Sequence, residues 1–477
     1  MSTLQWKRSH IVAVAVSALL LVVILYSSSS QSTLQPQDIR KTMKQQNSYY
    51  SHWPRLHLPG SPIEQANIMK DCLQTPPSQF MRLDNIQKIK QQWSQSTTSH
   101  CRDLYTAFTS IFTITDFPAK VVIPKKYESK VRKWLGNDED LFQNAKLQTV
   151  LYIYNEYTKE ENVFNPLREK RPIAKPEQPE RQYVEELFKE TQPTCDFCKY
   201  KENTAEDVFG RIESKMSFTA ANTFKLGAWH TLILPKKHHP LNWTKKEYLD
   251  LMDTCMKWVD KAHQENKAFV NPMLIMDLLP HAGASQIHPH VHAFLDRDRY
   301  QGAIENWRIG AQRYSEDFPG RNYFSDLVSV HSALGLGVTY GKAVAIASLL
   351  PKRDNEVVVI SEEPCDDYFK LIYFVYRAFL DDMEKLCYSS GYALPSLDKS
   401  GPGRLPAYTR IVTRGAVATV RSETSSLELF TSQNANTDPF RVMDYFHSLA
   451  KESSHGDLTL SVYNDHSDFL NDPEERL

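Results

Sequence analysis

Residues 283–294, Gly-Ala-Ser-Gln-Ile-His-Pro-His-Val-His-Ala-Phe, place three histidines at alternate positions. Successive side chains of an extended strand point to opposite faces, so His288, His290 and His292 are predicted to share one face. Pro289 cannot donate to a strand ladder, which places it near a strand start or on an edge. Imidazole is a common metal ligand and, near neutral pH, also a nucleophile or a general acid–base. A merely polar strand face is the alternative.

The residues before the histidines favour phosphate chemistry. Gly283, Ala284 and Ser285 are small and would let a phosphate group approach backbone N–H groups closely, with the Ser285 hydroxyl as a further donor. Gln286 belongs to the same turn. The sequence therefore predicts a phosphate-handling histidine site.

This stretch resembles the active-site signature of the histidine-triad superfamily, and especially its galactose-1-phosphate uridylyltransferase branch, which reads Gly-x-Ser-x-x-His-Pro-His-x-Gln. The matching residues are Gly283, Ser285, His288, Pro289 and His290. His292 stands where the transferases have Gln, and the hydrolase branch has histidine there. The resemblance implies nucleotide chemistry on a histidine but leaves the outcome of the reaction open.

A Cys-x-x-Cys pair, Cys195 and Cys198, is compatible with half a zinc site, a redox motif or two unrelated thiols. Pro193 and the polar stretch 199–206 argue against a thioredoxin-type motif, which needs a strand before it and a helix after it. A zinc site would need two more ligands from elsewhere in the chain.

The segment 227–238 resembles the superfamily's hallmark strand, although Trp229 stands where that pattern has Gly. The resemblance implies a structural Zn²⁺ site whose four ligands are Cys195, Cys198, His238 and His288. Two thiolates and two neutral imidazoles close a tetrahedral site. His239 could replace His238, and His230 is expected to pack beneath the strand.

The resemblance also implies a mechanism. His290 would attack the α-phosphorus of a nucleotide and form a covalent nucleotidyl-histidine, which divides one hard displacement into two easier ones. Ser285 would stabilise charge on the phosphoryl oxygens, and His292 would donate to the phosphate or assist the leaving group. Asn222 aligns with a family asparagine near the ribose, with turn capping as the alternative. The predicted substrate-binding residues are Asn222, Gly283, Ser285, Gln286 and His292.

Three classes of function follow. The first is an enzyme: a nucleotidyltransferase acting on a nucleotide or nucleotide sugar, or alternatively a nucleotide phosphohydrolase or phosphorylase if water or phosphate is the acceptor. The second is a catalytically inactive, membrane-anchored protein that binds a nucleotide or glycan, and the third is a structural zinc domain. The intact His290 and Ser285 argue against the last two.

The N-terminus predicts a membrane segment. Lys7 and Arg8 precede an uncharged apolar run over residues 11–26, which is short for a span but fits a signal anchor or a cleaved signal peptide. We expect a single-pass type II protein of the Golgi or endoplasmic reticulum with a luminal catalytic domain, or alternatively a secreted protein. Asn242 begins a glycosylation sequon, usable only in the lumen. Cys72 and Cys101 could pair there or could be buried free thiols.

Length and composition limit the possible domain organisation of the chain. With 477 residues, 41% of them hydrophobic, the chain can bury more than one core. The 56 basic and 57 acidic residues balance, so no nucleic-acid partner is expected; a homodimer is left open. We expect an α+β protein with tandem histidine-triad-like domains, each an antiparallel sheet with packed helices. The predicted parts are a cytoplasmic tail (1–10), the anchor (11–26), a stem and N-terminal region (27–145), the catalytic domain (146–315), a diverged second copy without the triad (325–450) and an acidic tail (451–477).

Periodicity predicts the elements of both copies. Strands are expected over residues 148–155, 271–279, 341–350, 356–360, 409–413 and 426–430. Helices are expected over 182–190, from a cap at Thr244 and over 366–387. The order of elements in 217–295 recurs after residue 341, which indicates the repeat.

Overall fold

The structure, a computed structural model, describes residues 56, 71–73, 81–171, 176, 178–398, 405–419, 432–452 and 461–462. The predicted anchor at 11–26 and the predicted strand at 426–430 lie outside these residues. Among the helices that are described, none is long and apolar enough to cross a membrane. The longest, α10 (Lys245–Glu265), has 21 residues and carries charges along its length. This finding contradicts the predicted type II membrane localisation, and Asn242 is accordingly not proposed as a luminal glycosylation site.

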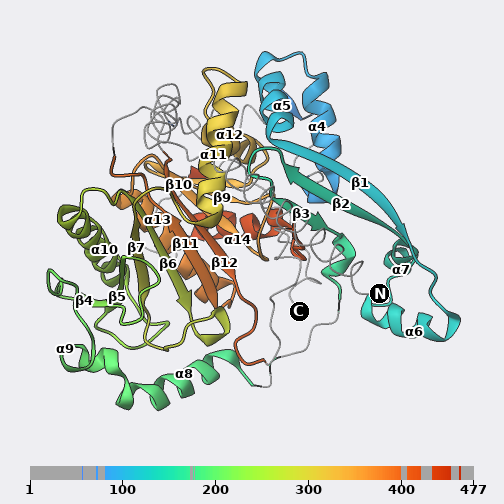
Figure 1. The fold of residues 1–477 in the computed structure, drawn as a ribbon. Helices are drawn as coiled ribbons and strands as arrows, with labels where there is room; N and C mark the ends of the chain where they lie inside the picture. Colours follow the sequence, from blue (N-terminus) through green and yellow to red (C-terminus); the bar gives the residue numbers. More distant parts are fainter. Residues whose placement is uncertain are drawn as a thin grey trace, which may run out of the picture. The chain divides into compact units, whose positions relative to one another are not determined.

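The main sheet has ten strands in the order β14-β8-β9-β10-β12-β11-β6-β7-β5-β4 (Figure 1). Every neighbouring pair is antiparallel. The bounds of its strands are β4 (Ser217–Ala221), β5 (Trp229–Pro235), β6 (Asn271–Leu278), β7 (Val291–Asp296), β8 (Gly337–Tyr340), β9 (Ala343–Ala347), β10 (Val357–Ser361), β11 (Tyr388–Ala393), β12 (Ala407–Thr413) and β14 (Ser461–Val462).

Two stretches of this sheet share one strand order. The first is β4-β5-β7-β6 with α10 between β5 and β6, and the second is β9-β10-β12-β11 with α13 (Asp366–Arg377) between β10 and β11. They join edge to edge through the antiparallel pair β6–β11, in which Leu278 lies opposite Tyr388. Hydrogen bonding is therefore continuous across both stretches.

Helices α10 and α13 pack on one face of the sheet and bury its apolar side chains. Thr244 caps α10 in a reciprocal capping box with Glu247, as its sequence predicts. Val291, Ala293 and Leu295 of β7 are completely or almost completely buried. Because neighbouring side chains alternate, His292 points to the other face. The histidine site is thus built on the face opposite α10.

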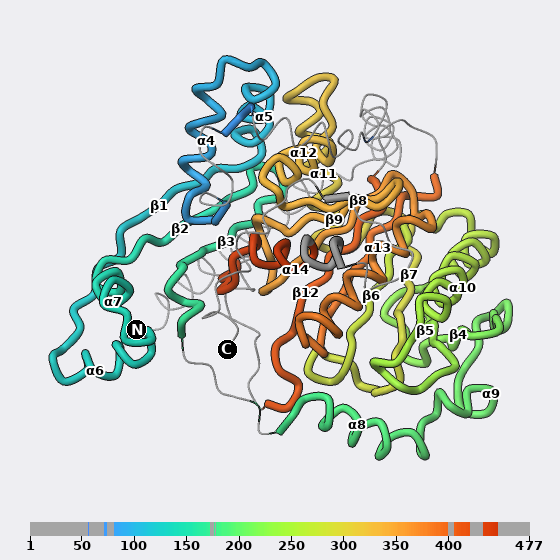
Figure 2. The backbone as a smooth tube through the Cα atoms, turned by 180° about the vertical axis from the view of Figure 1, so that it is seen from behind, coloured from blue at the N-terminus to red at the C-terminus, as the bar shows by residue number. Residues whose placement is uncertain are grey.

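A second sheet, β1-β2-β3-β13, contains a long antiparallel hairpin (Figure 2). Its strands are β1 (Phe112–Lys120), β2 (Leu147–Asn155), β3 (Glu161–Phe164) and β13 (Ser432–Gln433). The remaining α-helices are α4 (Ile86–Gln95), α5 (Ser99–Ile111), α6 (Lys125–Trp134), α7 (Glu139–Lys146), α8 (Glu180–Thr191), α9 (Tyr200–Asn203), α11 (Gly302–Asp317), α12 (Tyr323–Ala333) and α14 (Pro439–Glu452). Cys72 and Cys101 form a disulfide.

A buried ion cluster ties this second sheet to the main one. Arg410 of β12 donates to Glu160 at 2.6 Å and to Glu356 at 2.7 Å, and Lys352 lies 2.9 Å from Glu160. Burial alone would raise the pKa of Glu160, but Arg410 and Lys352 outweigh it and lower that pKa to about 2. Glu160 is therefore a carboxylate held in the protein interior by two cations.

Two predicted boundaries are wrong. The helix expected over 366–387 ends at Arg377 and continues only as a π-turn over Ala378–Asp382. The strand expected to carry all three histidines begins at Val291, so His288 and His290 precede it. Pro289 offers no N–H to a ladder, which explains why pairing starts after His290.

Candidate metal and histidine site

The two cysteines are presented by a tight turn after α8. Thr194 ends one 3₁₀ turn, and Asp196–Lys199 forms the next. The amide N–H of Cys198 donates to the carbonyl of Cys195 at 3.1 Å, which brings both thiols to the same side. The two thiols of the Cys-x-x-Cys pair are therefore adjacent and can act together as ligands.

These thiols meet two histidines from separate parts of the main sheet. His238 follows β5, and His288 precedes β7. The four ligand atoms, the two Sγ atoms and one ring nitrogen from each histidine, lie within 4.8 Å of one another. Cys195, His238 and His288 are buried, and Cys198 is exposed. The structure thus brings all four predicted ligands together from three distant stretches.

The distances within this group fit a tetrahedral zinc ion. Zn–S bonds of about 2.3 Å and Zn–N bonds of about 2.0–2.1 Å place a sulfur and a nitrogen about 3.6 Å apart and two nitrogens about 3.3 Å apart. The Sγ of Cys195 is 3.6 Å from Nδ1 of His288, and the two Nδ1 atoms are 3.2 Å apart. The Sγ of Cys198 is 3.3 Å from Nδ1 of His238 and 3.8 Å from that of His288. These four separations are compatible with a tetrahedral zinc ion.

The other ring nitrogens are held by hydrogen bonds. Nε2–H of His288 donates to the carbonyl of Pro235 at 2.7 Å, and Nε2–H of His238 donates to Oγ1 of Thr191 at 3.2 Å. Burial lowers the pKa of both imidazoles, that of His288 to about 4. Both rings are therefore neutral and direct the Nδ1 lone pair at the metal position, as metal-binding histidines require. His239 turns away and pairs with Glu185 at 2.8 Å.

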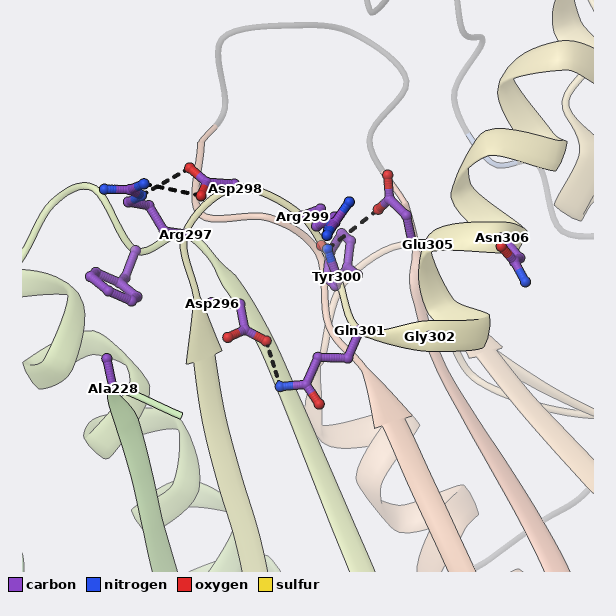
Figure 3. Close-up of a pocket in the computed structure, with 11 residues that line it drawn as sticks. Ala228, Asp296, Arg297, Asp298, Arg299, Tyr300, Gln301, Gly302, Glu305 and Asn306 are labelled. Atoms are coloured by element: carbon purple, nitrogen blue, oxygen red, sulfur yellow. Dashed lines mark hydrogen bonds and ion pairs between the residues drawn. The ribbon is translucent and has the colours of Figure 1, made fainter. Parts of the chain in front are cut away.

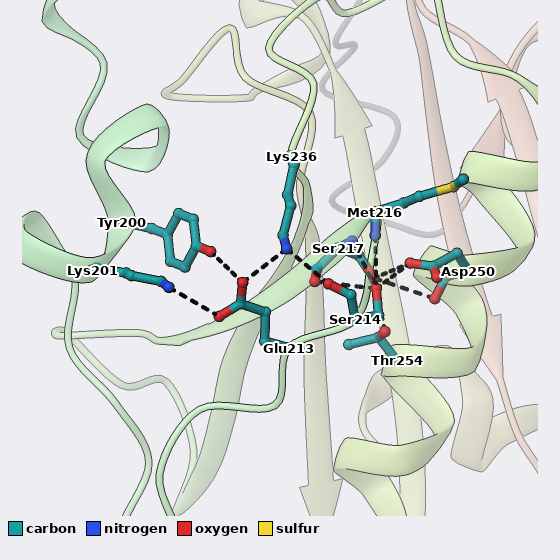
Figure 4. Close-up of polar contacts among 9 residues, drawn as sticks. All are labelled: Tyr200, Lys201, Glu213, Ser214, Met216, Ser217, Lys236, Asp250 and Thr254. Carbon is teal, nitrogen blue, oxygen red and sulfur yellow. Dashed lines mark hydrogen bonds and ion pairs between the residues drawn. The ribbon is translucent and has the colours of Figure 1, made fainter.

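Glu213 joins the two halves of this ligand set (Figure 4). Its carboxylate accepts from the Tyr200 hydroxyl at 2.7 Å and from Lys236 Nζ at 2.8 Å, and Lys201 Nζ lies 3.7 Å away. Tyr200 follows the cysteine turn directly, and Lys236 lies two residues before His238. Glu213 therefore fixes the cysteine turn relative to the end of β5. Sequence patterns did not single out this residue, because its three partners are spread over 36 positions.

A second polar group beside it anchors β4 to α10. Ser217 donates to the Asp250 carboxylate at 2.6 Å and lies 2.7 Å from the hydroxyl of Thr254. Figure 4 shows these side chains converging between the strand and the helix. They contain no imidazole, so we assign them a structural role.

His290 is almost completely buried, at 5% exposure, and one of its nitrogens is fixed. Its Nδ1–H donates to the backbone carbonyl of His288 at 2.9 Å. Burial lowers the pKa of His290, so its ring is neutral. The Nε2 atom consequently carries a lone pair, which is the form of imidazole that acts as a nucleophile.

His292 is held in one tautomer by His230. The backbone N–H of Leu226 donates to Nδ1 of His230 at 3.1 Å, so Nε2 of His230 carries the proton of the neutral ring. That atom lies 3.0 Å from Nδ1 of His292 and donates to it. Burial, aided by the Lys225 ammonium, lowers the pKa of His230 to about 4, and burial lowers that of His292 to about 3. His292 therefore presents a neutral Nε2–H donor.

We expected His230 to pack beneath the strand, and the structure shows it completely buried. Its ring, however, lies on the same face as His292 and stacks on Phe294 with centroids 4.2 Å apart. The side-chain nitrogen of Asn222 is 3.4 Å from Nε2 of His230, so Asn222 also belongs to this group.

The predicted phosphate turn is only partly tied to the histidines. Gly283 has φ +111°, which favours glycine, and Leu279 at the start of the turn has φ +74°. Ser285 and Gln286 are exposed in the turn before β7. In the described part of the chain, no hydrogen bond joins their side chains to His290 or His292.

Comparison with known proteins gives structural similarity only. No family model and no curated protein matches the sequence. An ADP-glucose phosphorylase from Arabidopsis thaliana with bound ADP-glucose has a TM-score of 0.49 and 14% identity, covering 62% of this chain and 97% of that chain. A galt-like protein from the same plant has a TM-score of 0.45 and 14% identity, covering 53% and 91%. A uridylyltransferase has a TM-score of 0.44 and 10% identity, covering 64% and 99%. Similarities of this size assign neither a family nor an activity to the chain.

Proposed function

We propose that the protein is a nucleotidyltransferase that acts through a covalent nucleotidyl-His290 intermediate on a nucleotide or nucleotide sugar. The observation that carries the proposal is the fixed pair of tautomers: His290 offers an Nε2 lone pair beside the Nε2–H of His292. The two ring centroids are 5.0 Å apart, so one phosphoryl group can contact both. A merely structural zinc domain would not require this arrangement.

In the first step, Nε2 of His290 attacks the α-phosphorus, a P–N bond forms, and the bond from phosphorus to the leaving oxygen breaks with its electron pair on that oxygen. In the second step, an acceptor oxygen attacks the same phosphorus, loses its proton to solvent, and the P–N bond breaks to restore His290. Ser285 and the backbone N–H groups of its turn are proposed to bind the phosphoryl oxygens.

The hydrogen-bond donor of His292 favours transfer of the nucleotidyl group between groups that leave readily as anions. Its neutral ring is not a general acid near neutral pH, because the pKa of His292 lies at about 3 and His230 donates to Nδ1. It therefore acts as a hydrogen-bond donor, as an amide side chain would. Such a donor suits groups that leave as anions, including phosphate and sugar phosphates. Water or inorganic phosphate as the acceptor would make the enzyme a hydrolase or a phosphorylase.

The metal would be structural. A Zn²⁺ ion on Cys195, Cys198, His238 and His288 would have no open coordination position, so it would order the segment that presents His290 rather than supply a reacting group. We also propose that the chain contains two copies of one unit, because β4-β5-β7-β6 and β9-β10-β12-β11 share their strand order.

A labelling experiment tests the proposal. The zinc-loaded protein is incubated with nucleotides and nucleotide sugars carrying ³²P at the α-position and quenched in alkali, in which phosphohistidine survives. We expect label on the peptide that contains His290, lost in His290→Gly and kept in His281→Gly, a control on the preceding turn. Release of label to sugar phosphate, phosphate or water identifies the acceptor. Absence of protein-bound label with every donor, or label on a peptide without His290, would refute the proposal.

A further inference from the structure

The connection between β1 and β2 concentrates positive charge. Residues 117–134 contain Arg132, a single acidic residue, Glu128, and five lysines, whereas the whole chain has a net charge of −1. The five are Lys120, Lys125, Lys126, Lys130 and Lys133. We call this segment the basic arm; it consists of the end of β1, a short link and α6. Figures 1 and 2 show α6 at the end of the β1–β2 hairpin that points away from the main sheet.

The lysines of the basic arm are all exposed and carry unneutralised charge. Within the described residues, no ion pair joins any of these five side chains to a carboxylate, and Arg132 is paired with Glu139. The surface in Figure 3 differs, because there Arg297 lies 2.8 Å from the carboxylate of Asp298. The positive charge of the basic arm is therefore available to an external anion.

Apolar side chains are exposed among these lysines. Val122 is 94% exposed and Phe117 is 54% exposed, and Val121 and Leu147 are exposed as well. Leu147 lies opposite Lys120 in the ladder between β1 and β2, so the aliphatic and charged side chains are neighbours. A group of exposed apolar side chains rimmed by charge marks an interaction surface.

One face of α6 places aromatic rings beside a lysine. Tyr127 and Trp134 are about two turns apart, and their ring centroids are 5.7 Å apart. Between them, Nζ of Lys130 lies 5.1 Å from the centroid of the Trp134 ring. Tyrosine, tryptophan and lysine suit the boundary between lipid headgroups and acyl chains, because each combines an apolar body with a polar tip.

A cavity of about 240 Å³ continues this surface beyond Trp134. Trp134 and Leu135 contribute apolar wall, and the segment after β3 contributes Arg168, Lys170 and Arg171. Cations therefore lie on both sides of the exposed tryptophan.

We propose that the basic arm binds the anionic surface of a lipid bilayer. Its lysines contact the headgroups, and Val121 and Val122 enter the boundary between headgroups and acyl chains. The contact is peripheral and reversible, since a folded surface lies on the bilayer and no part of the arm spans it. The exposed valines favour this partner over a nucleic acid, whose phosphates would use only the cations. A second copy of the chain would place like charges opposite one another.

Vesicle co-sedimentation tests this inference on the full, zinc-loaded chain. The probes are vesicles of phosphatidylcholine alone and vesicles that also contain about 30% phosphatidylserine. We expect the chain to bind the anionic vesicles at least about tenfold more tightly than the neutral ones. Raising the salt concentration from about 0.05 M to about 0.5 M should remove this preference, because salt screens the lysines.

Two variants of the basic arm locate the contact. Lys125→Glu/Lys126→Glu should remove the preference for anionic vesicles, and it should stay folded because glutamate is favourable in the first turn of α6. Val122→Asp should weaken binding to the anionic vesicles by about threefold or more, since it puts a charge where an apolar side chain enters the bilayer.

Matched controls make the same changes outside the basic arm. Lys246→Glu/Lys267→Glu reverses two exposed lysines, and Val208→Asp alters a valine that is 87% exposed; both should bind as the unsubstituted protein does. Residues 11–26 are present in every variant, so binding through them would be common to all. Equal affinity for both kinds of vesicle, or a preference that Lys125→Glu/Lys126→Glu retains, would overturn the inference. Binding to a DNA duplex, or self-association of the chain, in place of vesicle binding would also overturn it.

Discussion

His230→Phe is the substitution that most directly tests the histidine pair. Phenylalanine keeps a ring that can stack on Phe294, where the centroids are now 4.2 Å apart, but it removes the Nε2–H that donates to His292. His292 Nδ1 would then be a buried acceptor without a partner, and the ring could adopt the other tautomer, in which Nε2 no longer donates. Leaving a buried polar atom unsatisfied costs about 1–3 kcal/mol.

If that cost falls on the transition state, nucleotidyl transfer to His290 should slow by about 5- to 150-fold, since 1.36 kcal/mol corresponds to a tenfold change in rate. Rapid-quench, single-turnover labelling with an α-³²P donor measures the step directly. Zinc content should be unchanged, because His230 is outside the ligand set. His230→Gln, which retains an N–H donor, should recover part of the rate. Equal labelling rates for His230→Phe and the unsubstituted protein, with zinc intact, would refute the role of His230.

The remaining predictions concern the metal and the fold. Protein purified without added zinc should contain about one equivalent, and Cys195→Ser should reduce it; folded, active and metal-free protein would remove the metal site. Glu213→Gln should accelerate zinc loss to a chelator by about tenfold or more, as loss of outer contacts commonly does, whereas Glu202→Gln on α9, beside Lys201, should not. Glu160→Gln should lower the free energy of unfolding by about 3–5 kcal/mol, because it removes the buried charge that Arg410 and Lys352 share. The exposed Glu156→Gln should have little effect, and equal melting temperatures for Glu160→Gln and the unsubstituted protein would contradict this. The pKa of Glu160 in the folded protein is about 2, below its ordinary value of 4.5. Its contribution of about 3 kcal/mol to the free energy of unfolding is therefore present above pH 4.5 and is lost as the pH falls through 2. Acid titration of unfolding will show this loss.

Local patterns in the sequence predicted the elements with strong periodicity. Strand β6 and helix α10 with its Thr244 cap lie where the sequence places them. The side-chain alternation was also informative, since the even-numbered residues of β7 do share a face. The strand itself was predicted three residues too long at its start, because the alternation of the histidines begins at His288, whereas the ladder begins only after Pro289 and His290.

The parts that the sequence could not show depend on long-range contacts. The pairing of His230 with His292 joins residues 62 positions apart, and it became visible only when β5 and β7 were paired. Glu213 carries no motif and acts through neighbours in space. The predicted membrane localisation failed for a different reason: it rested on hydropathy of a short run, which no helix in the described residues supports.

Because the two stretches of the main sheet share one strand order, equivalent positions in them can be compared. If Ser217 of β4 is aligned with Ala343 of β9, the strand registers align His230 with Glu356. Across the next strand pair, they align His292 with Arg410. The same two positions thus hold a neutral donor pair in one stretch and a buried salt bridge in the other. In the stretch β4-β5-β7-β6 this pair is uncharged, and in the stretch β9-β10-β12-β11 the equivalent positions include Arg410, which binds Glu160. Substitutions at matching positions should therefore have different effects, lost turnover in the first stretch and lost stability in the second.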